Sequence, residues 1–151
     1  MMDTTDKKLL KLLQTDCKST TKEFSMKLNL SVTAIYERIK KLEKEGIISS
    51  YVALLNRNKI EKSFVVFCQI KLIQQSKDFI LDFEKEVIKF NEILECFNVS
   101  GDYDYILKIV VKDMEEYRDF LVNKLSTLHQ IASKHSTFMI GEVKNTTVIS
   151  V

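Results

Sequence analysis

The segment STTKEFSMKLNLSVTAIYERIKKLEKEG, at residues 19–46, contains two helix starts separated by a short turn. Thr20 followed three residues later by Glu23 is a capping-box pattern, which predicts that a helix begins here. Asn29 tolerates the left-handed backbone conformation and therefore predicts the end of that helix. Ser31 is a favourable N-cap for a second helix. The two helices are then only about three residues apart, which is typical of a helix-turn-helix.

The second of these helices has two different sides when its residues are placed at about 100° intervals. Ile35, Ile39 and Leu42 share a narrow sector and are expected to face the core. The remaining surface is polar and basic, so we expect it to enter a major groove and to neutralise phosphates. The candidate DNA-binding residues are Ser31, Thr33, Ala34, Tyr36, Glu37, Arg38, Lys40, Lys41 and Lys44. A solvated, lysine-rich face is the alternative for this helix taken alone.

The residues on either side complete a predicted winged helix-turn-helix over residues 1–55. Leucines in TDKKLLKLLQTD, at residues 5–16, form the stripe of an amphipathic helix. Gly46 ends the recognition helix, and the β-prone runs of residues 47–56 suit a small wing. Residues 1–55 hold ten Lys and Arg against seven Asp and Glu, whereas residues 56–151 hold thirteen against fourteen. This asymmetry favours double-stranded DNA as the partner of the N-terminal part.

The rest of the chain predicts a second domain at residues 63–151, after a linker at residues 56–62. Strands are expected at residues 63–73, 92–100, 103–111 and 133–144, and amphipathic helices at residues 76–90 and 113–128. A tight hairpin at Gly101-Asp102 joins the two middle strands. The order βαββαβ is ferredoxin-like, with both helices on one face of an antiparallel sheet, so the fold class is α+β. The uncovered sheet face predicts a dimer.

Composition argues against several other classes of protein. No run approaches the roughly eighteen apolar residues of a membrane helix, and the N-terminus lacks a secretory signal pattern, so a cytoplasmic location is expected. Three widely spaced cysteines and two histidines resemble no zinc site, and no cofactor is expected. Asp102 and Asp104 have no accompanying nucleophile, metal or oxyanion hole, which argues against catalysis.

Two long stretches resemble the Lrp/AsnC (feast/famine) transcriptional regulators. They are LNLSVTAIYERIKKLEKEGIISSYVALLN and LECFNVSGDYDYILKIVVKDMEEYRDFL, and the resemblance runs from about Asp6 to Lys144. It implies a DNA-binding winged helix, a C-terminal RAM domain that senses amino acids, and dimers that frequently assemble into tetramers or octamers. Carried over by position, the effector-binding residues are Gly101, Asp102, Asp104, Ser136 and Thr137.

This assignment is chemically reasonable for an amino-acid effector. Gly101 allows backbone N–H groups to approach an α-carboxylate, and Asp102 or Asp104 can accept a hydrogen bond from an α-ammonium group. A plain hairpin tip is the alternative for this turn. The family often has proline at the position of Val32 or Ala34 and glycine at the position of Asn29, so this chain departs from the family pattern at these positions.

The sequence therefore predicts a transcriptional regulator that responds to an amino acid and is not an enzyme. An architectural DNA-binding protein without a sensor is the first alternative. Some tetrapyrrole decarboxylases also look similar to this family, but their substrates carry several carboxylates that need clusters of arginine and histidine. This chain offers only Arg38, Arg57 and Arg118 with two histidines.

Overall fold

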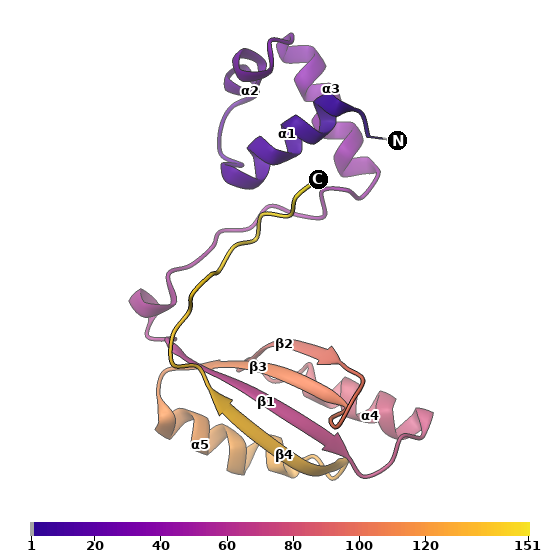
Figure 1. Ribbon diagram of the computed structural model, residues 1–151, viewed down its shortest axis with the longest axis vertical. Coiled ribbons are helices and arrows are strands. Elements are labelled where there is room, and N and C mark those ends of the chain that lie inside the picture. The colour runs from indigo at the N-terminus through magenta and orange to yellow at the C-terminus, as the bar shows by residue number, and fades with distance from the viewer. Residues whose placement is uncertain (1) are drawn as a thin grey trace. The chain divides into compact units, whose positions relative to one another are not determined.

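Three helices form the N-terminal unit of the computed structural model, which describes residues 2–151 (Figure 1). They are α1 (Thr4–Thr15), α2 (Thr21–Leu28) and α3 (Val32–Lys44). Thr20 and Glu23 form the predicted capping box, and the Ser31 side chain accepts a hydrogen bond from the Ala34 backbone. The helix-turn-helix predicted from the sequence is therefore confirmed.

The turn between α2 and α3 is fixed by Asn29, whose backbone is left-handed with φ 53° and ψ 49°. The Ser25 hydroxyl closes the turn by donating to the Leu30 carbonyl at 2.7 Å. Beneath it lies a small apolar core to which α1, α2 and α3 all contribute. Its buried members are Leu9, Leu10, Leu13, Phe24, Ile35 and Leu42.

Residues 47–56 do not form the strands that a wing would need, since the first strand of residues 2–151 begins at Phe64. β-prone residues form a strand only where a partner supplies the hydrogen-bonded ladder. Here the backbone N–H groups of Ile47 and Ile48 bond back to the Leu42 carbonyl. The segment beyond them stays extended, with the Tyr51 hydroxyl donating to Glu43.

The C-terminal end of the chain, Val143–Val151, groups with residues up to Leu54 in this first compact unit, and Leu55–Glu142 forms the second. Gln14 and Ile149 exchange two hydrogen bonds, one from the Gln14 amide to the Ile149 carbonyl and one from the Ile149 backbone N–H to the Gln14 side chain.

The second unit contains a four-stranded antiparallel sheet in the order β2-β3-β1-β4. Both helices lie on one side of it, as a ferredoxin-like βαββαβ order requires (Figure 1). A 3₁₀ turn at Arg57–Ile60 precedes the sheet, and another at Leu125–Thr127 follows the last helix. The elements are β1 (Phe64–Leu72), α4 (Lys77–Val87), β2 (Ile93–Asn98), β3 (Tyr105–Val111), α5 (Met114–Asn123) and β4 (Ile131–Phe138).

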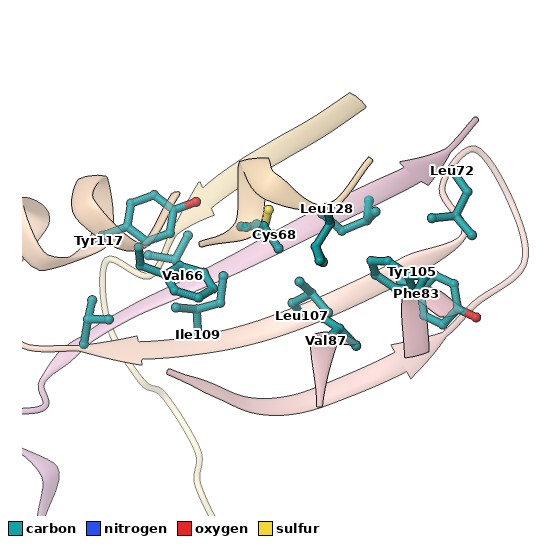
Figure 2. Close-up of a cluster of buried hydrophobic side chains, with 14 residues drawn as sticks. Val66, Cys68, Leu72, Phe83, Val87, Tyr105, Leu107, Ile109, Tyr117 and Leu128 are labelled. Atoms are coloured by element: carbon teal, nitrogen blue, oxygen red, sulfur yellow. The ribbon is translucent and has the colours of Figure 1, made fainter. Parts of the chain in front are cut away.

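Alternate residues of β1 and β3 point to the helices and form the main core (Figure 2). Phe83 of α4 packs against Tyr105, with ring centroids 4.8 Å apart. Cys68 is fully buried there, and desolvation raises the pKa of its thiol. Half-buried Cys96 has its thiol pKa raised to about 11, mainly by desolvation, whereas Cys17 is exposed.

The opposite face of the sheet is partly apolar and open. Strand register places Phe97, Ile106, Gln69 and His135 side by side in one row across β2, β3, β1 and β4. Phe97 is 52% exposed and Phe67, in the neighbouring row, is 38% exposed. Large side chains of this kind, gathered on one sheet face, are typical of an interaction surface.

Candidate DNA-binding face and effector site

The outward side of α3 presents most of the predicted DNA-binding residues to solvent. Thr33, Tyr36, Glu37, Lys40 and Lys44 are exposed. Ser31 is also exposed, while Ala34 is half-buried, and the hydrogen bond between them caps the helix at 3.1 Å. Ile35 and Leu42 are fully buried on the opposite side. The buried and exposed sides that the sequence predicted for this helix therefore agree with the structure.

The lysines of α3 surround a shallow hollow of about 500 Å³, lined by Glu37, Lys40, Lys41, Lys44 and Glu45. The Lys40 ammonium donates to Glu43 at 2.8 Å and lies 5.8 Å from the centre of the Tyr36 ring. The hydrogen bond to Glu43 is the main reason that the pKa of Lys40 lies above its ordinary value. Lys40 is thus cationic at neutral pH, and its side chain is 54% exposed, so that it is accessible to a phosphate.

Arg38 lies in a different environment from these lysines. One terminal nitrogen of its guanidinium donates to Asp3 at 2.7 Å and to Asp6 at 2.5 Å. The Lys41 ammonium lies 3.6 Å from the other Asp6 oxygen. Sequence reasoning did not identify Asp3 and Asp6, although a carboxylate at the N-cap and another three residues later is a readable capping pattern.

Asp6 is a carboxylate with no exposed surface. Desolvation favours its neutral form, but the backbone N–H of Asp3 and the Arg38 guanidinium outweigh that effect and hold its pKa below the ordinary value. The backbone hydrogen bond from Asp6 and the bond from Arg38 also lower the pKa of Asp3. Both carboxylates are therefore ionised at neutral pH.

The predicted effector turn is longer than the two-residue hairpin expected from Gly101-Asp102. The backbone N–H of Val99 donates to the Asp104 carbonyl at 2.9 Å, and four residues lie between them. Gly101 has φ 127°, a conformation that favours glycine. Gly101 and Asp102 are both exposed, so their polar groups are accessible to a ligand.

Asp104, by contrast, is buried and already bonded within the chain. Its carboxylate accepts from the Leu72 backbone at 2.7 Å and from the Gln75 amide at 2.6 Å, and the Lys71 ammonium lies 3.7 Å away. Its backbone N–H donates to the Ile70 carbonyl. Asp104 thus joins the start of β3 to the end of β1. Lys71 and Gln75, both distant in sequence, were not anticipated.

Ser136 and Thr137 lie on opposite faces of β4. The Ser136 hydroxyl lies 2.5 Å from that of Tyr117, on the helix side of the sheet, and Ser136 pairs with Cys68. Thr137 is exposed on the open face and pairs with Phe67. Their partners Cys68 and Phe67 lie in the middle of β1, whereas the Gly101 turn lies beside the end of that strand, at Leu72. One chain therefore does not bring Ser136 and Thr137 into a pocket with the Gly101 turn.

The two tyrosines of this turn have different environments. Tyr105 is buried, and its hydroxyl donates to Glu84 at 2.6 Å, which identifies it as a core residue. Tyr103 is half-buried, with its ring 6.4 Å from that of His135. Across residues 2–151 there is no group of three or more His, Cys, Asp or Glu placed to hold a metal ion, and no helix is long and apolar enough to cross a membrane.

Comparison with known families matches both units of this fold. Residues 2–49 match a family described as "Winged helix-turn-helix DNA-binding", and residues 65–149 match the "Lrp/AsnC ligand binding domain". The chain belongs to the Lrp/AsnC family. The predicted family and fold class are thereby confirmed, and the chain is a DNA-binding regulator of this family that carries its ligand-binding domain.

Several members of the Lrp/AsnC family are similar to the chain over nearly its whole length. The leucine-responsive regulatory protein of Escherichia coli (strain K12) is 38% identical over 143 residues, which cover 95% of this chain and 87% of that protein. The Bkd operon transcriptional regulator of Pseudomonas aeruginosa is 32% identical over 142 residues, covering 94% and 93%.

Solved structures agree with these relatives. A transcriptional regulator from Neisseria meningitidis, in complex with L-Met, superposes with a TM-score of 0.94 at 32% identity, over 99% of this chain and 96% of that one. An AsnC family transcriptional regulator from Agrobacterium tumefaciens superposes with a TM-score of 0.93 at 33% identity, over 98% and 96%.

Proposed function

We propose that this regulator binds double-stranded DNA through the outer side of α3 and that an amino acid bound to its C-terminal domain alters its DNA binding or assembly. The observation that carries the first part is the capped helix-turn-helix with an exposed, lysine-lined α3. The second part is supported by the family's ligand-binding domain and by the similar Neisseria meningitidis regulator, whose structure holds L-Met.

The DNA-binding proposal is tested by the salt dependence of affinity. Each phosphate contact contributes about 0.9 to the slope of log affinity against log salt. We expect Lys40→Gln with Lys44→Gln to weaken DNA binding and to reduce the slope by about 2, as measured by fluorescence anisotropy. Lys77→Gln with Lys85→Gln, on exposed positions of α4, is the matched control. An unchanged slope in the α3 variant would remove these lysines from the interface.

The open sheet face supports a homodimer as the basic assembly, with tetramers or octamers built from it. Phe67, Phe97 and Ile106 form its apolar part, and a second copy of the same face is self-complementary under two-fold symmetry. We propose that dimer formation brings Thr137 of one chain near the Gly101 turn of another. An effector site that needs two chains is supported by the distance, within one chain, between Thr137, which pairs with Phe67, and the turn beside Leu72.

Within that site we assign the ligand contacts to Gly101 and Asp102, and to Thr137 from across the interface. Asp104 holds the turn in place, while Ser136 faces the helices and is the weaker candidate. A bound effector stabilises the folded state by mass action. A thermal-shift screen of the twenty amino acids is therefore the test, with Asp102→Ala expected to abolish the shift and Asp82→Ala, on α4, expected to retain it. A shift that survives Asp102→Ala would place the pocket elsewhere.

The screen also separates the sensor from an architectural DNA-binding protein, which would show no shift with any amino acid.

We propose that the protein is a regulator and not an enzyme, in keeping with relatives that are named as regulators. An absorbance change on adding a tetrapyrrole would contradict this. Because its relatives are regulators of the bacteria Pseudomonas aeruginosa and Escherichia coli, we also propose a cytoplasmic location. We also propose residues 1–55 as the DNA-binding domain, residues 56–62 as linker and residues 63–151 as the effector and dimerisation domain.

A further inference from the structure

Arg38 is the one arginine of the DNA-binding face, yet its guanidinium is bonded to two carboxylates of the same unit. We propose that Arg38 positions α3 against α1 instead of contacting phosphate, and that its pairing with Asp6 leaves Lys41 available for DNA. This inference rests on the proposed DNA-binding function and divides the basic side chains of α3 into two groups with different roles.

The geometry of the cluster supports a fixed Arg38. Its side chain is 29% exposed, the Asp6 side chain is fully buried, and Asp3 is half-exposed. Asp3 and Asp6 also bond to each other's backbone N–H groups, at 3.1 and 2.7 Å, as the capping box of α1. Arg38 therefore connects the rigid first turn of α1 to the middle of α3, two points more than thirty residues apart in sequence.

The electrostatic balance also keeps Arg38 in place. A carboxylate without access to water is strongly destabilised unless a cation and hydrogen bonds remain with it. If Arg38 moved to a phosphate, Asp6 would keep the hydrogen bond from the Asp3 backbone N–H, but its one remaining cation would be Lys41, whose ammonium is 3.6 Å away. Such a move would replace the ion pair between Arg38 and buried Asp6 by a solvent-exposed pair between Arg38 and a phosphate. Salt screens an exposed pair more strongly than a buried one, so the move is unfavourable.

Lys41 has the opposite properties. Its side chain is 45% exposed, and its distance from Asp6 exceeds that of a hydrogen bond. Asp6 keeps its closer partner, Arg38, when Lys41 turns outward. Lys41 also lines the hollow that contains Lys40 and Lys44. It is therefore the side chain of this cluster that is free to reach the DNA.

The test compares the salt slopes of DNA binding for Arg38→Gln, for Asp6→Asn with Arg38→Gln, and for Lys41→Gln, each in the full-length chain. Arg38→Gln alone should lose about 1 from the slope, because Lys41 is drawn to the unpaired Asp6. The double variant should recover the wild-type slope, because neither charge of the Arg38–Asp6 pair remains and Lys41 is not drawn inward. Lys41→Gln should again lose about 1. A double variant that loses as much as Arg38→Gln would show that Arg38 contacts phosphate.

A second variant keeps the inference testable if Arg38→Gln fails to fold. Asp3→Asn with Asp6→Asn retains the side-chain volumes and releases Arg38 from its anions, so the slope should become steeper by about 1. An unchanged slope in this variant contradicts the inference. A wild-type chain whose DNA binding shows no salt dependence overturns both this inference and the proposed function, whereas normal wild-type binding with the contrary variant result overturns this inference alone.

Discussion

The carboxylates of the GDYD turn are two residues apart but differ in their surroundings. Asp102 is exposed, whereas Asp104 accepts hydrogen bonds from Leu72 and Gln75 and is only 8% exposed. A change at Asp104 therefore alters the fold of the turn as well as any ligand contact. At the scale of single residues, we therefore expect a change at Asp104 to affect the stability of the fold and a change at Asp102 to affect recognition of the effector.

We expect Asp104→Ala to lower the free energy of unfolding by about 1–3 kcal/mol, because it leaves the buried Leu72 N–H without an acceptor. Asp102→Ala should change it by less than about 0.5 kcal/mol, as is usual for exposed positions. Differential scanning calorimetry of the full-length chain measures both. Equal stability of the two variants would contradict the role given to Asp104.

The pair Asp3 and Asp6 makes stability depend on acid pH. Their folded-state pKa values lie below the unfolded value of 3.8, so this stabilisation is complete above pH 3.8 and is lost as the pH falls through the folded-state values. We expect Asp6→Asn to weaken the loss of stability below pH 3.8, as followed by urea unfolding at several pH values. Asp82→Asn is the control, and an acid response in Asp6→Asn equal to the wild type would argue against the ion pair.

At the scale of elements, local signals determine most of the helices and strands. Caps at Thr20, Ser31 and Asp113 lie within one turn of the helices they start, so the sequence alone located these boundaries. The wing could not be judged in this way, because a strand depends on a partner that residues 47–56 lack in this structure. The pairing of Arg38 with Asp6 was likewise hidden, since it joins positions that only the packed helices bring together.

The α2–α3 turn offers a direct test of element geometry. Asn29 adopts the left-handed conformation with φ 53°, which costs most L-residues about 1–2 kcal/mol. Asn29→Ala should therefore lower the free energy of unfolding by about 1 kcal/mol, whereas Asn29→Gly should stay within about 0.5 kcal/mol of the wild type. Urea unfolding of the full-length chain checks both, and a harmless alanine would indicate a different turn.

At the scale of the whole molecule, we propose that the open sheet face governs assembly. Its aromatic side chains have no helix over them, and a polar rim surrounds them, as at many homodimer interfaces. The effector site we propose depends on this face. Within one chain, Thr137 pairs with Phe67 in the middle of β1, whereas the Gly101 turn lies beside Leu72 at the end of that strand. Loss of the dimer should therefore remove the amino-acid response as well.

We expect Phe67→Asp with Phe97→Asp to reduce the mass measured by light scattering to the 17.6 kDa of one chain. The aspartates would introduce charges that lose water on association without gaining a partner. Leu81→Asp, at an exposed position of α4, should leave at least a dimer. A double variant that keeps the wild-type mass would exclude this face as the primary interface.

The three cysteines differ enough in exposure for one of them to be labelled selectively. Cys68 is sealed in the sheet core and the Cys96 thiol has its pKa raised to about 11, while Cys17 is exposed just after α1. Because thiolates are the reactive form, a maleimide dye at neutral pH should attach at Cys17 in the native chain without mutagenesis. Each DNA-binding unit of an assembly would then carry one reporter, so energy transfer between copies can follow their separation as DNA or an amino acid is added.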